Sequence, residues 1–222
     1  RLKPHGLVLG ADVATSSRAT IGGMIGNNSS GAHSLLYGKT SEQVLELDVV
    51  LADGTRTTLR PLGPAELAAA VGAADRIGSL CGRIDALVRE AAAEIDARFP
   101  KVMRRVSGYD LAAFVRDGAS FDLGRLVVGS EGTLCSVVGA KLRLVELPRH
   151  TALVACHFAD LIEAMSANLV ALETGPAAVA LTDRVLLDLT RNSPEHATTR
   201  SFVQGDPEAL LFVEYYGDDP GQ

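Results

Sequence analysis

An Asp-Gly pair between two apolar runs is the strongest constraint on how this chain folds. Residues 44–51 form the β-rich run Val-Leu-Glu-Leu-Asp-Val-Val-Leu, and Asp53-Gly54 then leads into a threonine-rich run at 55–59. Because aspartate and glycine tolerate the positive φ angles of a tight turn, this pattern predicts an antiparallel hairpin. Polar and apolar residues alternate poorly in the second run, so we expect that strand to lie at the edge of a sheet.

Loop and helix patterns flank the hairpin. Residues 7–31 are rich in glycine, serine and asparagine and predict a loop, with a helical turn from Ile21. An alanine- and leucine-rich tract starts at Pro64 and is broken by glycines, which favours two helices. The second helix is expected over 79–98, where apolar residues recur at helical spacing until Pro100 stops them.

Further strands are expected in the second half of the chain. Residues 126–128 and 134–138 read as apolar strands on either side of the loop 129–133, and residues 141–147 extend the second of them. After Pro148 the pattern is strand, helix, strand, helix, strand, which predicts a second unit. Its five elements are expected at 151–158, 160–172, 177–181, 183–190 and 210–216. The fold class is therefore α+β.

Composition excludes several kinds of protein. The formal net charge is −6 with interspersed signs, so no basic face for nucleic acid is expected. The three cysteines lie far apart, without metal-ligand spacing, and no apolar run reaches the roughly 18 residues of a membrane span. We expect a cytoplasmic protein with reduced thiols, and leave open a peripheral place at the inner membrane for the full-length protein.

The glycine-rich loop 20–31 is the first candidate for a binding site. Its glycines let a backbone approach a flat ligand closely, and its asparagines and serines supply short hydrogen bonds. A flavin requires such groups along its pyrimidine edge. On composition alone a tight surface turn before a strand is the better interpretation, and the loop lacks the lysine of a Walker motif.

Two other segments are weaker candidates. The loop 129–133, Gly-Ser-Glu-Gly-Thr, either pinches a flat ligand between strands or is a plain hairpin turn in which Glu131 accepts a backbone hydrogen bond. Arg104 and Arg105, near Tyr109, either meet an anionic group or form a solvated basic patch. His33 is a weak candidate to line the glycine loop. The chain offers no histidine at a metal-ligand interval, so no metal ligand is assigned.

These segments together, in this order, resemble the FAD-linked oxidase family with a PCMH-type FAD-binding domain, as in vanillyl-alcohol oxidase. The resemblance rests on Ser17-x-x-Thr-Ile-Gly-Gly-x-Ile-x-x-Asn-x-x-Gly31, on 37–38 and 49–54, on Ser-Gly-Tyr-Asp-Leu at 107–111 and on Val-Gly-Ser-Glu-Gly-Thr-Leu at 128–134. It implies that residues 1–147 are the second lobe of that domain, a mostly antiparallel sheet with flanking helices. Residues 148–222 would begin a ferredoxin-like cap domain.

The resemblance also implies which residues contact the cofactor, a non-covalent FAD. The first loop would lie against the isoalloxazine and ribityl groups, and the second would approach from a facing strand. The implied positions are Ser17, Thr20, Ile21, Gly22, Gly23, Ile25, Asn28, Gly31, Glu131, Gly132 and Val137. The sequence departs from the common family residues at Met24, Ser30 and Cys135.

Members of the family that act on D-lactate, glycolate or D-2-hydroxyglutarate match these motifs best. The implied chemistry is hydride transfer from a D-2-hydroxy acid to flavin N5, with electrons passed to a quinone, a cytochrome or an iron–sulfur domain. Segments 24–29 and 99–109 suggest the long subgroup that is fused to an iron–sulfur half. A same-fold oxidase of another alcohol or sugar, and a non-catalytic flavin-binding or interaction module, remain open.

We further expect this chain to be a fragment of a longer protein. The family's pyrophosphate loop would lie upstream of Arg1, and its catalytic histidines and metal-binding carboxylate downstream of Gln222. No catalytic residue is therefore assigned to this chain. The isolated fragment should bind FAD weakly or not at all and should have no turnover.

Overall fold

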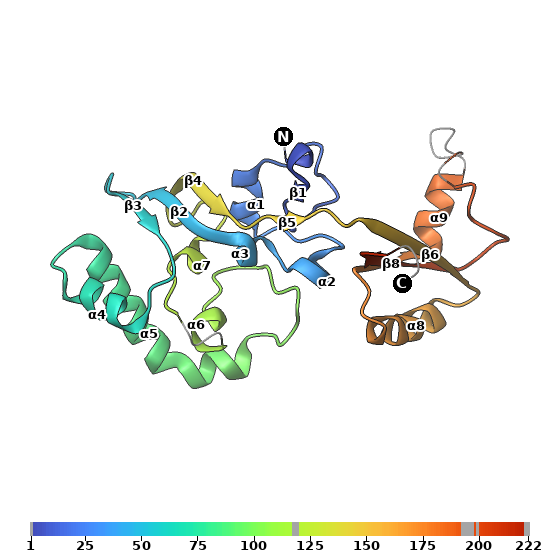
Figure 1. The fold of residues 1–222 in the computed structure, drawn as a ribbon. Coiled ribbons are helices and arrows are strands. Elements are labelled where there is room, and N and C mark those ends of the chain that lie inside the picture. Colours follow the sequence, from blue (N-terminus) through green and yellow to red (C-terminus); the bar gives the residue numbers. More distant parts are fainter. Residues whose placement is uncertain (1, 117–119, 192–197, 199, 220–222) are drawn as a thin grey trace. The chain divides into compact units, whose positions relative to one another are not determined.

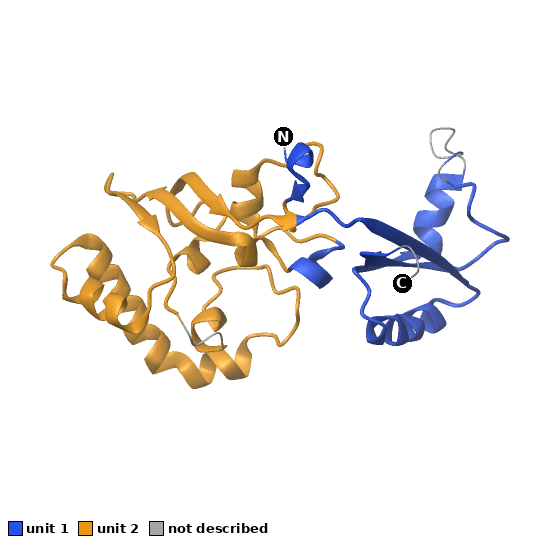
Figure 2. Ribbon diagram, in the orientation of Figure 1, with its two compact units in different colours: residues 1–8, 32–37, 146–222 blue, residues 9–31, 38–145 orange. Residues whose placement is uncertain are grey.

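A computed structural model describes residues 2–116, 120–191, 198 and 200–219. The chain divides into two compact units, coloured separately in Figure 2. We call residues 9–31 and 38–145 the hairpin unit. Residues 1–8, 32–37 and 146–222 form the C-terminal unit. Each unit is built on its own three-stranded sheet.

The sheet of the hairpin unit is antiparallel with the strand order β3-β2-β4 (Figure 1). Strand β2 (Val44–Val50) pairs with β3 (Arg56–Leu59), and Leu47 faces Leu59. The turn between them includes Gly54 at φ +84°. The predicted hairpin and the edge position of its second strand are both confirmed.

The other neighbour of β2 is β4 (Ser136–Leu142), with Val49 opposite Val137. The register shifts between Asp48 and Val49, which indicates a bulge in the ladder. A Cβ at Gly139 would lie 2.8 Å from a carboxylate oxygen of Asp48, so glycine suits this crowded position. Strand β5 (Val145–Glu146) follows at the boundary between the units.

The expected strand at 126–128 is wrong. Residues 124–127 form the short helix α7 (Gly124–Val127), and the N–H of Gly124 donates to the Asp122 carboxylate at 2.8 Å. An apolar run of three residues has the same pattern in a buried helix as in a strand, so periodicity cannot distinguish them. The loop 129–133 therefore joins a helix to a strand and is not a hairpin turn.

The core of the hairpin unit brings α1 (Ile21–Asn27), the sheet and α7 together. It consists of Ile25, Leu47, Val49, Leu59, Val127 and Val128, each less than 8% exposed. The short helix α3 (Thr40–Gln43) lies next to α1 and β2. The core therefore holds both candidate glycine loops through their apolar neighbours.

Two longer helices, α4 (Pro64–Gly72) and α5 (Arg76–Arg98), pack against each other, and α5 also packs against α6 (Ala112–Arg116). Helix α5 begins three residues earlier than predicted because Asp75 caps it, accepting from the N–H of Gly78 at 2.7 Å. A Cβ at Gly78 would lie 2.2 Å from the carbonyl oxygen of Ala70. This glycine therefore permits a close approach between the helices and does not break α5.

The C-terminal unit has the predicted element order. It contains β6 (His150–Phe158), α8 (Leu161–Glu173), β7 (Ala178–Asp183), α9 (Arg184–Arg191) and β8 (Ala209–Gly217), together with η1 (Lys3–His5), β1 (Leu7–Val8) and α2 (Ser34–Tyr37). Strand β8 lies between β6 and β7 and is antiparallel to both. Within the described ranges, the structure has no helix that is long and apolar enough to span a membrane.

Candidate cofactor-binding site

The first glycine loop folds into helix α1, which is fixed at both ends. The Thr20 hydroxyl accepts a hydrogen bond from the N–H of Gly23 at 3.1 Å and so caps the helix. The helix ends at Asn28, which adopts a left-handed conformation with φ +52°. Asn28 is 2% exposed, and its side-chain oxygen accepts from the N–H of Ser41 at 3.0 Å. Asn28 thus holds the loop from inside the unit.

The second loop is bonded directly to the end of α1. The N–H of Gly129 donates to the carbonyl of Ile25, and the N–H of Glu131 donates to that of Gly26, both at 2.9 Å. The side-chain amide of Asn27 donates to the Glu131 carboxylate at 3.2 Å, across 104 residues of sequence. The two candidate loops therefore form one continuous surface.

A tight turn shapes the second loop. The N–H of Thr133 donates to the carbonyl of Ser130 at 3.0 Å, and the two residues between them, Glu131 and Gly132, have φ angles of +53° and +75°. Two positive φ angles in succession are the signature of a type I′ turn. The Thr133 hydroxyl lies 2.9 Å from the Tyr109 hydroxyl, so the segment 106–109 is tied to the same turn.

A pocket of about 350 Å³ opens between these segments. It is lined by Asn27, Val106, Ser107, Gly108, Tyr109, Gly129, Ser130, Glu131 and Thr133. Its walls carry hydroxyl and amide groups and the Glu131 carboxylate, and the described residues that line it include no lysine, arginine or histidine. Such a wall can hydrogen-bond the edge of a neutral, flat, polar ring system.

The glycines of this surface fit a ligand that approaches the backbone. A Cβ added at Gly22, Gly26 or Gly132 would meet no protein atom within 4 Å. Because glycine has no side chain, a ring can approach the main chain there more closely than it can at any other residue. The residues present therefore fit one wall of an FAD site.

The predicted site residues divide into groups by position. Glu131 is the one predicted contact that lines the 350 Å³ pocket. Gly22 and Gly132 face open space, and Ile21 is 46% exposed beside Gly22. Ser17 lies in an exposed turn that precedes α1.

Other residues that were predicted to contact the cofactor instead contribute to the packing of the hairpin unit. The side chain of Ile25 is 1% exposed in the core, and Val137 packs against that core from β4. A Cβ at Gly23 would lie 3.1 Å from the capping hydroxyl of Thr20. A Cβ at Gly31 would lie 1.5 Å from the carbonyl oxygen of Asp12, so this glycine is required by packing.

Asn27, Tyr109 and Thr133 are among the pocket residues that were not predicted as cofactor contacts. Asn27 stands in a motif position where any residue is allowed. Tyr109 and Thr133 belong to candidate segments whose individual residues were not assigned to the cofactor. The bond between their hydroxyls is a non-local contact that no local pattern reveals.

The remaining candidates lie elsewhere. Arg105 pairs with Asp110, whose side chain is 8% exposed, and its guanidinium lies 5.6 Å from the centre of the Phe99 ring. Arg105 is therefore neither a solvated patch nor an open anion site. In the C-terminal unit, His33 lies 3.0 Å from the Glu214 carboxylate and stacks on Tyr216 at 5.3 Å. His33 is not among the residues that line the 350 Å³ pocket.

Comparison with known proteins gives this surface its context. Residues 1–60 match the family model described as the FAD binding domain, and the match includes the whole first glycine loop. In this segment the chain is similar to the FAD-linked oxidase family. Relatives in this family match along its entire length.

The chain is 34% identical to the D-2-hydroxyglutarate dehydrogenase of Pseudomonas putida, over 100% of its own length and 22% of the relative. It is also 34% identical to the enzyme of that name from Escherichia coli, over 98% of the chain and 22% of the relative. A D-lactate dehydrogenase from Archaeoglobus fulgidus is 26% identical over 92% of the chain and 34% of the relative. The chain thus spans about a fifth of the first two relatives.

A solved structure confirms the fold class. Alkyldihydroxyacetonephosphate synthase superposes with a TM-score of 0.58 at 17% identity, covering 97% of this chain and 32% of that protein. At this identity the similarity concerns the fold alone. The α+β architecture is therefore shared with a known structure over almost the whole chain.

Proposed function

We propose that this chain supplies one wall of the flavin site in an FAD-dependent oxidoreductase that oxidises a D-2-hydroxy acid. The observation that carries the proposal is the pair of backbone hydrogen bonds between α1 and the loop 129–133. Relatives that match the chain over its full length are named D-2-hydroxyglutarate dehydrogenase. The family motifs alone place these loops far apart in sequence. In the structure they make one open, polar, glycine-lined surface.

When bound, FAD would supply the two-electron chemistry by accepting a hydride from the substrate. The residues of this chain would hold and orient the ring. The glycine backbones of α1 and the turn would allow close approach, and the amide of Asn27 and the hydroxyls of Tyr109 and Thr133 would face its polar edge. Asn27 also holds the Glu131 carboxylate by a 3.2 Å bond, which keeps that negative charge in a fixed place.

The reaction itself would need residues from the remainder of a longer protein. We assign no base, substrate-binding residue or metal ligand to this chain, and the described residues include no cluster of three or more histidine, cysteine or acidic side chains that could hold a metal ion. In this proposal residues 1–147 complete an FAD-binding domain and residues 148–222 begin the cap domain. A quinone, a cytochrome or an iron–sulfur domain would take the electrons.

The test uses the full-length protein. Purified protein should carry bound FAD, visible as absorbance in the blue region, and D-2-hydroxyglutarate should bleach that absorbance without oxygen. A panel of D-lactate, glycolate and D-2-hydroxyglutarate with an artificial electron acceptor then ranks the substrates. Full-length protein that lacks flavin, or flavin that no D-2-hydroxy acid reduces, would contradict the proposal.

The role of this particular wall needs a variant. Asn27→Leu removes the amide from the pocket while leaving the core residues of α1 in place. We expect weaker FAD retention, while the apoprotein should lose no more than about 1 kcal/mol of stability, because only exposed side-chain hydrogen bonds with Ser29 and Glu131 disappear. Asn168→Leu, on helix α8 of the C-terminal unit, is the matched control and should leave FAD retention unaltered.

A further inference from the structure

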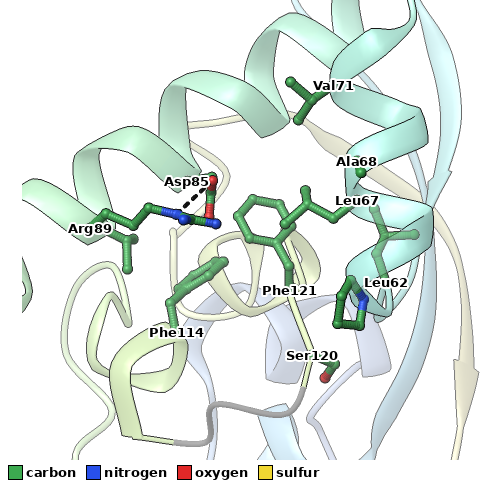
Figure 3. Close-up of a pocket in the computed structure, with 11 residues that line it drawn as sticks. Leu62, Leu67, Ala68, Val71, Asp85, Arg89, Phe114, Ser120 and Phe121 are labelled. Atoms are coloured by element: carbon green, nitrogen blue, oxygen red, sulfur yellow. Dashed lines mark ion pairs between the residues drawn. The ribbon is translucent and has the colours of Figure 1, made fainter.

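A pocket that α4 and α5 border in the hairpin unit lies outside the flavin wall (Figure 3). It has a volume of about 520 Å³, within the range of small-molecule sites. Its lining comes from α4, α5, α6 and the segment around Phe121, and none of these residues lines the 350 Å³ pocket. It therefore requires an explanation independent of FAD.

Apolar and aromatic side chains form about half of this pocket's lining, and Asp85, Arg89 and Ser120 supply polar groups. Leu67 and Val71 line it from α4, and Phe114 and Phe121 meet edge to face on the other side with ring centres 5.2 Å apart. Val71, on α4, is 44% exposed although α4 packs against α5. Apolar area left accessible in a concave site is the surface that an apolar ligand body would cover.

One ion pair provides the charge at this pocket. The Nε of Arg89 lies 2.9 Å from the Asp85 carboxylate, one turn earlier on α5, and Figure 3 shows the Arg89 side chain extending toward the pocket. The Arg89 side chain is 76% exposed, whereas that of Asp85 is 28% exposed. Asp85 thus pairs with the guanidinium beside the pocket and is itself the less accessible of the two groups.

The geometry leaves most of the guanidinium available. Arginine has five N–H donors, and the ion pair with Asp85 engages the one on Nε. No second ion pair or hydrogen bond of Arg89 occurs in the part of the chain that the structure describes. The two Nη groups form the planar fork that binds a carboxylate through two parallel hydrogen bonds.

We propose that this pocket binds a small carboxylic acid with an apolar body. The carboxylate would pair with the Nη groups of Arg89, and the apolar body would lie against Val71, Phe114 and Phe121. Asp85 acts as a positioning residue, because a guanidinium that is already held loses less freedom when it binds a ligand. The proposal does not depend on the flavin site.

Octanoate is the probe, and titration calorimetry on the full-length protein is the measurement. Octanamide and octylammonium have the same apolar body with a neutral and a positive head group. We expect octanoate to bind about tenfold more tightly than octanamide, as a charge-assisted pair of about 1.4 kcal/mol requires. Octylammonium should bind most weakly, and preferential binding of octylammonium would overturn the proposal.

Two variants locate the site. Arg89→Gln should abolish the preference for octanoate over octanamide, and Ala68→Phe, which fills the pocket from α4, should abolish binding of both. Arg98→Gln is the matched control, because Arg98 forms the same kind of ion pair with Glu94 on the same helix but does not line the pocket. Binding that survives both pocket variants, or that Arg98→Gln weakens equally, would overturn the proposal.

Discussion

The backbone N–H of Gly129 donates to the carbonyl oxygen of Ile25 at 2.9 Å. Ile25 is buried in the core, and Gly129 directly follows Val128, which is buried in the same core. The bond therefore joins two loops through residues that cannot move independently. The packing of the hairpin unit's core therefore determines where the candidate flavin wall lies.

The first prediction concerns Gly129. Its φ is +89°, which strains any residue other than glycine. A Cβ would also lie 3.2 Å from the Cβ of Asn28, so Asn28 would have to shift in Gly129→Ala. We expect the free energy of unfolding to fall by about 2 kcal/mol, measured by urea denaturation. Gly132→Ala is the control. It has φ +75° and open space around its Cβ, so it should cost about 1 kcal/mol. Equal losses would mean that contact with Asn28 adds nothing.

The second prediction separates binding from packing within the first loop. Gly22→Ala should leave stability unchanged or raise it by up to about 1 kcal/mol, because nothing lies within 4 Å of the new Cβ and alanine favours helix. In the full-length protein it should weaken FAD binding about tenfold. Gly31→Ala should instead destabilise the protein by about 3 kcal/mol, since its Cβ would overlap the carbonyl of Asp12. An unchanged FAD affinity for Gly22→Ala would remove Gly22 from the site.

The third prediction concerns Arg105. Its guanidinium is paired with the buried Asp110 and also donates to the carbonyl of Pro100 at 3.3 Å. Arg105→Ala should lower the free energy of unfolding by about 3 kcal/mol, because it leaves a buried carboxylate unpaired. The double variant with Asp110→Ala should lose less than the sum of the two single variants. A stable Arg105→Ala protein with weakened anion binding would instead support the anion-site interpretation.

The fourth prediction is a pH dependence. Burial raises the pKa of the Asp122 carboxyl, an effect that the Gly124 N–H and the charge of Arg125 partly oppose. Folding therefore favours the protonated form. Stability is lost as the pH rises from the ordinary aspartate pKa, about 3.9, through the raised value of the folded state.

Asp122→Asn carries no such charge and should therefore gain stability relative to the natural chain as the pH rises. Its amide oxygen can still accept from the Gly124 N–H. Urea denaturation of both proteins at about pH 3.5 and about pH 7 measures the difference. A difference that stays constant across this range would show that Asp122 does not titrate in this way.

Local patterns predicted most of the fold. The Asp-Gly turn and its flanking runs identified the hairpin, and alternating strand and helix patterns identified all five elements from β6 to β8. The failures occurred where local and tertiary signals compete. Three apolar residues at 126–128 suit either a helix or a strand, and packing against β2 decides for α7. Helix α5 starts after its cap, Asp75, but Gly78 in its first turn was interpreted as a break, so the helix was predicted to start three residues later.

The candidate site was predictable in outline and not in detail. The residue types of the loop 20–31 and of the loop 129–133 suggested a ligand-facing backbone, and the family resemblance suggested that both belong to one site. The bond between Asn27 and Glu131 could not be predicted, because neither side chain carries a signal of its partner. Likewise, only the tertiary structure shows that the carbonyl group of Asp12 leaves no room for a side chain at position 31.

The distance along the chain between the two joined loops has a consequence for synthesis. Asn27 and Glu131 are separated by 104 residues, so α1 leaves the ribosome long before its partner loop. At ordinary elongation speeds of roughly 5–20 residues per second, that interval is on the order of 5–20 seconds. A nascent chain therefore offers no complete wall to a cofactor during this time. This wall is therefore complete for a cofactor only after the second loop has been translated.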